Sequence, residues 1–377
     1  MVGLVALMFT LSYAGRSLLP PMLLPIASEF NMNSTDALSL VLVLSVGYGF
    51  GMFSSGLLAS LFRARSLVVF SIGGAGCCLI LMLWAAHFWQ AGCLLAVFGY
   101  IAGMYFPAGM ATLSSLIESR DLGKAVSIHE LAPSTSLIIA PLFASLCLGS
   151  FEWRQCFALA GLIMVLGALF FALFAQGGKN KSPRPSFSGI ARLLCAPNTW
   201  VFMAFYTLLG AGIFACYTIL PLYLVEERHL APDTAYFIIS LSRLITPVFV
   251  LLGGLLADRF SPRRLLGGYF ILHGISLMLL TLPAFPVLVT GLVTQSMLAA
   301  ASFPVLFKFL ADIFPASRHS LVLGICPPLA AFIATGLLPR LLGYIGALFS
   351  FSAGFVMFGA IYVCAVLLFF VPMRNLE

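Results

Sequence analysis

The chain has 377 residues, of which 62% are hydrophobic and only 8% are charged. Soluble domains carry about 25% charged and about 45–50% apolar residues, so a water-soluble fold could not bury this much apolar surface. The net charge of +7 does not indicate a nucleic-acid partner, because the basic residues lie between apolar segments. The composition therefore predicts a polytopic membrane protein.

Twelve apolar segments follow one another along the chain, each close to the roughly 20 residues that a membrane-spanning helix needs. They begin near Val2, Ala37, Ser66, Gln90, Leu122, Gln155, Trp200, Asp233, Arg264, Val287, Ser320 and Ala347. Residues 176–198 are polar, basic and rich in Pro, Gly and Ser, which is typical of a linker. The sequence thus predicts an all-α membrane protein with a six-helix bundle over residues 1–175, a cytoplasmic linker over 176–198 and a second six-helix bundle over 199–377.

Basic residues outside the apolar segments set the expected orientation. With the N-terminus inside, most Lys and Arg fall on the cytoplasmic side, and only Arg154, Arg228 and Arg340 fall outside. This bias follows the positive-inside rule. We expect a multi-pass protein in the inner (cytoplasmic) membrane of a bacterium, with both termini cytoplasmic.

Motifs for enzymatic chemistry are absent from the sequence. The nine cysteines form no C-x-x-C or Cys/His pattern, so neither a disulfide nor a metal site is indicated. There is no phosphate-binding loop, and no Ser/His/Asp set lies at one depth. We therefore expect no enzymatic activity and no cofactor.

The two halves carry a sequence repeat. Residues 56–68 read GLLASLFRARSLV and residues 254–266 read GLLADRFSPRRLL, an offset of 198 residues with seven of thirteen positions identical. Both stretches lie at the turn between the second and third segments of their half. Such repeats are typical of alternating-access transporters, in which two bundles rock around a shared site.

The turn of the second half also contains the motif G-x-x-x-D-R-x-x-x-R-R. It is formed by Gly254, Asp258, Arg259, Arg263 and Arg264. With this motif, the twelve segments and the linker, the whole chain resembles the major facilitator superfamily. The resemblance implies two pseudo-symmetric bundles and secondary transport. Because the fifth segment lacks the Gly-Pro signature of drug/proton antiporters, multidrug antiport is disfavoured.

In the superfamily this motif acts as a latch for the inner gate. A helix N-terminus or a nearby cation would hold Asp258, and Arg259 would reach Asp312 at the end of the tenth segment. Lys308 is expected to pair with Asp312 four residues later. The alternative is a charge cluster that only sets the orientation. In the first half, Ser60 replaces the latch acid, so that side of the gate should be weaker.

Two arginines lie within apolar segments, where a charge costs about 2.5–3.5 kcal/mol on insertion scales and is a functional candidate. Arg16 is in the first segment and Arg243 in the eighth, and in the superfamily both segments face the central cavity. Guanidinium groups bind carboxylate or phosphate with two parallel hydrogen bonds, so the pair predicts an anion clamp. A first-segment arginine also resembles organic-anion members. The alternatives are a structural bond from Arg16 to a helix-end carbonyl and snorkelling of Arg243.

Glu130 and His129 are candidates for proton coupling in the fifth segment. Glu130 is the only carboxylate expected at depth, where desolvation favours the protonated form, and histidine changes charge near neutral pH. Neighbouring residues lie about 100° apart on a helix, so one should face the cavity and the other an adjacent helix. The alternative is a buried structural pair. His273 is expected to be peripheral.

These features favour a proton-coupled symporter that takes up a small organic anion. Its expected partners are the substrate, protons and the lipid bilayer, and the protein is expected to be a monomer. An exporter of amphipathic or drug-like compounds is the alternative within transport. A sensor or lipid-handling protein on the same fold is the alternative outside it.

Overall fold

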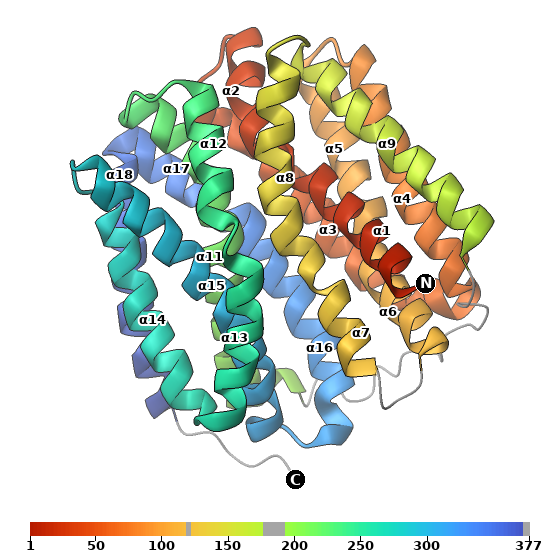
Figure 1. Cartoon of the computed structure of the whole chain (residues 1–377), viewed down its shortest axis with the longest axis vertical. Helices are drawn as coiled ribbons and strands as arrows, with labels where there is room; N and C mark the ends of the chain where they lie inside the picture. The colour runs from red at the N-terminus through yellow and green to blue at the C-terminus, as the bar shows by residue number, and fades with distance from the viewer. Residues whose placement is uncertain (118–121, 176–192, 372–377) are drawn as a thin grey trace. The chain divides into compact units, whose positions relative to one another are not determined.

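The computed structural model describes residues 1–117, 122–175 and 193–371, and every regular element in this part of the chain is a helix (Figure 1). The chain divides into two compact units, Met1–Pro185 and Ser186–Glu377. The predicted linker lies outside the described residues as far as residue 192.

In the described residues, the helices of each unit form six long stretches, some of them made of two helices. The first unit has α1 (Val2–Ser17), α2 (Leu19–Glu29), α3 (Ser34–Leu61), α4 (Ala64–Leu81), α5 (Phe88–Gly103), α6 (Tyr105–Leu116), α7 (Leu122–His129), α8 (Leu131–Leu148) and α9 (Trp153–Phe174). The second has α11 (Pro197–Leu222), α12 (Pro232–Arg243), α13 (Thr246–Arg259), α14 (Pro262–Leu279), α15 (Phe285–Ile313), α16 (Ala316–Phe332), α17 (Leu338–Leu348) and α18 (Phe351–Ala365).

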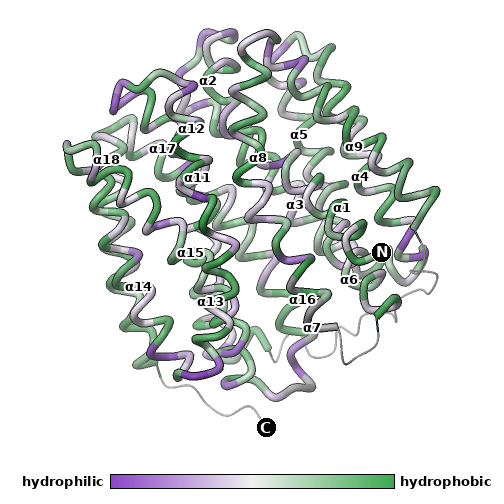
Figure 2. Tube along the Cα trace, in the orientation of Figure 1, coloured by the Kyte–Doolittle hydropathy of each residue, from purple (hydrophilic) through white to green (hydrophobic). Residues whose placement is uncertain are grey.

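The described helices have the length and composition of membrane spans. Eleven helical stretches within the described ranges are long and apolar enough to cross a bilayer. The twelfth is α14, which begins with Arg263 and Arg264 beside its N-terminal proline and is less apolar as a result. Figure 2 shows helices that are mainly hydrophobic, with hydrophilic stretches mostly at their ends. The predicted all-α, twelve-helix class is confirmed.

Glycine pairs bring two helices of each unit into backbone contact. α4 packs against α9 in the first unit, and α14 packs against α18 in the second. A Cβ on Gly76 would lie 2.7 Å from the carbonyl oxygen of Gly161, and one on Gly274 would lie 2.5 Å from that of Gly359. Both pairs are related by the offset of 198 residues found in the sequence (76 to 274, 161 to 359). The repeat is therefore a repeat of helix packing.

Gly99 and Gly103 on α5 have the same kind of role. A side chain on either would collide with the backbone of α3, at Leu44 and Tyr48 respectively. Four-residue spacing places both glycines on one face of α5, so the two helix backbones can approach closely.

Each unit has a cluster of hydrogen bonds, here called the clasp, that joins helix ends. In both units the clasp lies at the opposite helix ends from the α3–α4 and α13–α14 turns. In the first unit, Glu29 accepts hydrogen bonds from Trp153 Nε1 (2.6 Å) and Arg154 Nη1 (2.6 Å) at the start of α9. Arg154 also donates to the carbonyl oxygen of Ala85 (2.7 Å). The clasp thus ties together the ends of the first, third and sixth spans.

The second unit repeats this clasp with different side chains. Glu227 accepts from the backbone N–H of Phe351 (2.5 Å) and Ser352 (3.1 Å) at the start of α18. Arg228 donates to the carbonyl oxygen of Pro283 (2.9 Å). Positions 29, 85 and 153 correspond to 227, 283 and 351 through the same offset of 198.

Candidate functional site

Three of the ionisable residues singled out within the spans share one local feature, which is a proline four residues later. In an α-helix the carbonyl of residue i accepts from the N–H of residue i+4, and proline has no N–H to give. The helix is therefore interrupted at each of these places, between α1 and α2, between α7 and α8, and between α12 and α13. The pairs are Arg16 with Pro20, His129 with Pro133, and Arg243 with Pro247.

Arg16 lies in the last turn of α1, with only 9% of its surface exposed. Its guanidinium carbon lies 4.3 Å from the ring centroid of Tyr48 on α3 and 5.6 Å from that of Tyr13. A cation over an aromatic face is stabilised by the ring quadrupole, more so where water is excluded. The end of α1 thus presents a positive charge supported by tyrosine rings.

Arg243 is the last residue of α12 and is 3% exposed. Its guanidinium lies over the ring of Tyr217 on α11, 5.1 Å from the centroid. The Thr246 hydroxyl donates to the Arg243 carbonyl (2.7 Å), replacing the N–H that Pro247 lacks. Within the described residues, Nε and Nη2 of Arg243 have no hydrogen-bond partner. Burying a cation with two unused donors is costly, which makes Arg243 a candidate ligand-binding residue.

The two units build their arginine sites from the same parts. Each places an arginine over a tyrosine ring, using one residue from the first span and one from the second span of that unit. The arginine is on the first span in the first unit and on the second span in the second unit. The sequence named both arginines but not the tyrosines, whose role depends on how the helices pack.

His129 and Glu130 lie at the break between α7 and α8. The His129 ring is fully buried and stacks on Phe9 of α1, with ring centroids 4.2 Å apart. The Glu130 side chain is 37% exposed. Of the two residues, His129 is the one that faces an adjacent helix, α1. The two side chains nevertheless touch, with Nδ1 and Oε1 3.3 Å apart, because the chain is not regularly helical at Glu130.

Hydrogen-bond contacts join His129 to side chains on either side of it. Tyr105 donates its hydroxyl hydrogen to the Val5 carbonyl (2.6 Å), so its oxygen can only accept from His129 Nε2 (3.3 Å). With a hydrogen on Nε2, the contact between Nδ1 and Glu130 Oε1 needs one more proton, on either partner. Without that proton, the Nδ1 lone pair would face a carboxylate. Tyr105, His129 and Glu130 are therefore joined in one continuous series of contacts.

The charged motif at the α13–α14 turn has a different partner from the expected one. Lys308 Nζ lies 3.2 Å from Asp258 Oδ1 and also donates to the Ala257 carbonyl. Lys308 therefore pairs with Asp258 and not with Asp312, and no bond joins Arg259 to Asp312 in the part of the chain described. The reason is that α13 and α15 pack side by side, which turns Lys308 toward the end of α13.

The close contact between α13 and α15 is made by Gly253, the residue before the motif, and not by Gly254. A Cβ on Gly253 would collide with the backbone of Ala301 on α15, whereas one on Gly254 would meet only Pro304, at 4.0 Å. Gly254 therefore does not set the spacing of the two helices. Arg263 and Arg264 lie in the first turn of α14, and Arg259 in the last turn of α13.

Comparisons with known proteins agree with this architecture. The family model of the Major Facilitator Superfamily matches residues 5–250 and 217–376, which together cover nearly the whole chain. The chain belongs to this superfamily. Membership makes it a secondary transporter of a small solute in a lipid bilayer, and not an enzyme.

Solved structures of the superfamily share the fold at low sequence identity. A bacterial homologue of the human lysosomal transporter Spinster, in an inward-facing and occupied conformation, matches with a TM-score of 0.81 and 14% identity, covering 100% of this chain and 96% of that one. A D-xylose-proton symporter matches with a TM-score of 0.77 and 17% identity, covering 100% and 99%. No curated protein matches the sequence.

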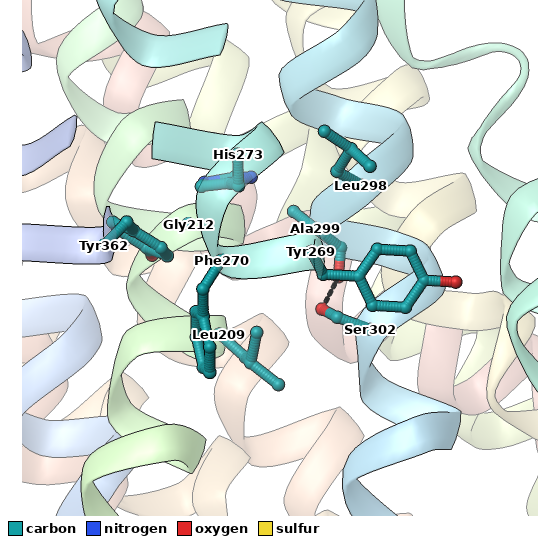
Figure 3. Close-up of a pocket in the computed structure, with 9 residues that line it drawn as sticks. All are labelled: Leu209, Gly212, Tyr269, Phe270, His273, Leu298, Ala299, Ser302 and Tyr362. Carbon is teal, nitrogen blue, oxygen red and sulfur yellow. Dashed lines mark hydrogen bonds between the residues drawn. The ribbon is translucent and has the colours of Figure 1, made fainter. Parts of the chain in front are cut away.

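This superfamily member also has a small, mainly apolar pocket inside its second unit, with His273 and Tyr362 among the residues that line it (Figure 3). His273, expected to be peripheral, is 3% exposed, and neither ring nitrogen has a hydrogen-bond partner in the described residues. A Cβ on Gly212 would lie 2.7 Å from His273 Nε2 and 2.8 Å from the Tyr362 hydroxyl. In the repeat, the positions equivalent to His273 and Tyr362 are Ala75 and Met164. The expectation was wrong because the sequence did not show which face of α14 is buried.

Proposed function

We propose that this transporter is a proton-coupled symporter that takes up a small organic anion across the inner membrane of a bacterium, with both termini cytoplasmic. Arg16 and Arg243 bind the negative charge of the substrate, and Glu130 with His129 carries the proton. The protein acts as a monomer. The observation that carries this proposal is the buried Arg243, whose Nε and Nη2 have no partner in the described residues.

An anionic substrate follows from the cost of such an arginine. A buried charge without a partner destabilises a protein by several kcal/mol unless something compensates it. The Tyr217 ring supplies about 0.5–2 kcal/mol as a cation–π contact and leaves both donors unused. An anion that supplies two acceptor oxygens would remove the remaining cost. Arg16, with its two tyrosine contacts, gives the first unit a second cation of the same type.

Proton coupling is supported by the hydrogen bonds of His129. In this proposal the Tyr105 hydroxyl donates to the Val5 carbonyl and accepts from His129 Nε2, so that the contact between His129 Nδ1 and Glu130 requires one further proton. Loss of that proton breaks the contact at the α7–α8 break and so can bias the position of these helices. A proton symporter is among the structures that share this fold.

In this proposal the α13–α14 turn gates the cytoplasmic side. Gly254, Asp258, Arg259, Arg263, Arg264 and Asp312 remain the gating residues. The cation that holds Asp258 is Lys308. Arg259 and Asp312 form no ion pair in the described residues of this conformation. In this proposal they pair in another conformation of the transport cycle.

Transport in proteoliposomes tests the proposal. Purified protein is reconstituted, and uptake of radiolabelled benzoate and acetate is measured with and without an inward proton gradient. We expect accumulation only with the gradient, and its loss in Arg243→Lys and Glu130→Gln. Uptake that does not depend on the proton gradient would refute the proton-coupling role of Glu130 and His129. Proton-driven efflux of cationic dyes with no carboxylate uptake would favour the exporter instead.

A further inference from the structure

One face of α12 gathers three buried polar side chains. Tyr236, Ser240 and Arg243 are spaced four and three residues apart, so they lie along one side of the helix. Their exposed fractions are 1%, 1% and 3%. α12 packs between α11 and α15, and the Tyr217 ring of α11 lies against Arg243. This face is therefore inside the second unit and shielded from lipid.

Three hydrogen-bond donors on this face have no partner in the described residues. They are the Ser240 hydroxyl and the Nε and Nη2 groups of Arg243. Nε–H and Nη2–H leave the planar guanidinium along the same edge and point in parallel directions. Because Tyr217 covers a face of the guanidinium, the open edge is what remains for a ligand. Ser240 adds a third donor one helical turn away.

The chemistry of these donors selects the ligand. Two parallel N–H groups match the two oxygens of a carboxylate, and a carboxylate oxygen can accept a further bond from a hydroxyl. The one positive charge matches one negative charge. Asp233, the nearest other charged residue on α12, is ten residues away, roughly 15 Å along the helix. On α12 itself, a phosphate dianion would find only this one cation for its two charges.

From this geometry we infer that the substrate presents a single carboxylate, bound side-on by Arg243 and hydrogen-bonded by Ser240. The inference rests on the proposed anion transport and narrows it to one chemical class. It also assigns Ser240, which the sequence analysis did not single out, to the binding site. The unpaired donors fix the orientation of the carboxylate as well as its charge.

Ligand binding by the full-length protein in detergent tests this inference. Acetate, benzoate, phenylphosphonate and benzamide are compared by thermal shift and calorimetry at constant ionic strength, because exposed charges respond to salt. We expect benzoate and acetate to raise the melting temperature, and phenylphosphonate and benzamide to have little effect. Tighter binding of phenylphosphonate would overturn the carboxylate assignment. So would an equal effect of benzamide, or no shift with either carboxylate.

Three variants locate the binding groups. Arg243→Lys keeps the charge but loses the parallel donors and should weaken benzoate binding at least tenfold, while Ser240→Ala should weaken it roughly threefold to tenfold. Ser242→Ala is the matched control, because the Ser242 hydroxyl already donates to the Ile239 carbonyl (2.8 Å). Wild-type affinity in Ser240→Ala, or an equal loss in Ser242→Ala, would refute the role of Ser240.

This assay separates the inference from the proposed transport. Binding is measured without any gradient, so it does not depend on Glu130 or on the direction of transport. Carboxylate binding without proton-driven uptake would support the inference and refute symport. Arg243-dependent binding of phenylphosphonate, with gradient-driven uptake of it, would keep anion symport and refute the carboxylate.

Discussion

Replacing Glu130 with Gln should uncouple this transporter while leaving substrate exchange intact. The Gln amide can donate to His129 Nδ1 as a protonated Glu130 would, so the contact of 3.3 Å can persist. The hydrogen bond from His129 to Tyr105, and that from Tyr105 to Val5, are untouched. The variant should therefore resemble the proton-loaded protein permanently.

The size of the effect follows from the number of protons. The His129–Glu130 contact accommodates one exchangeable proton, and Arg243 matches one carboxylate, so each cycle would carry one proton with one monoanion and no net charge. One pH unit is worth about 1.36 kcal/mol per proton, which is a tenfold concentration ratio. The wild type should reach about tenfold accumulation per pH unit, unaffected by membrane potential. Glu130→Gln should reach a ratio of about one.

Proteoliposomes with a clamped potential provide the assay. Net uptake of labelled benzoate is measured at zero and one pH unit of gradient, and counterflow exchange is measured without a gradient. Asp36→Asn, which removes a carboxylate near the start of α3, is the matched control and should behave as wild type. Gradient-driven accumulation by Glu130→Gln would show that the proton is carried elsewhere. Loss of exchange together with accumulation would show a structural role.

Further predictions concern the other features of the molecule. Arg16→Lys should weaken anion binding by about 1.5–3 kcal/mol in calorimetry, because the planar fork is lost, and normal binding would exclude Arg16 from the site. Asp258→Asn should change the unfolding free energy by less than about 1 kcal/mol, since the pair with Lys308 is exposed, yet should shift accessibility labelling toward inward-facing states; unchanged labelling and transport would refute the latch. Gly76→Ala should destabilise the first unit by about 1–3 kcal/mol in denaturant unfolding, whereas Gly73→Ala, whose Cβ would be 3.4 Å from Ala168, should not; equal stability would contradict the packing argument. In a cysteine-free background, Asn33→Cys should react with an impermeant thiol reagent from outside and Asn180→Cys only from inside, and the reverse pattern would overturn the orientation.

The spans could be predicted from the sequence because apolar composition over about 20 residues decides them without reference to neighbours. The helix breaks were also readable in principle, because Arg16, His129 and Arg243 each precede a proline by four residues. The residues that contact Arg16, His129 and Arg243 could not be predicted from the sequence. Tyr48, Tyr217 and Tyr105 reach them across helix contacts, and sequence spacing carries no record of which faces meet.

The errors have the same origin. Lys308 was assigned to Asp312 because both lie on one helix face in sequence, but the adjacent α13 offers Asp258 at 3.2 Å. His273 was placed at the periphery because a lone histidine in an apolar span has no pattern around it. Its burial depends on Gly212 and Tyr362, which come from two other helices.

The offset of 198 residues gives this protein an internal standard. The glycine pairs and the clasps lie at equivalent positions in both halves. The arginines lie on different spans in the two halves, and only the second half has polar side chains at the positions of His273 and Tyr362. The two halves thus share the packing framework and differ in the side chains to which we assign the solute and the proton. A substitution at a position shared by both halves can be compared with the same substitution made 198 residues away. The second variant measures the effect of the change on helix packing. The difference between the two variants then measures the effect on transport.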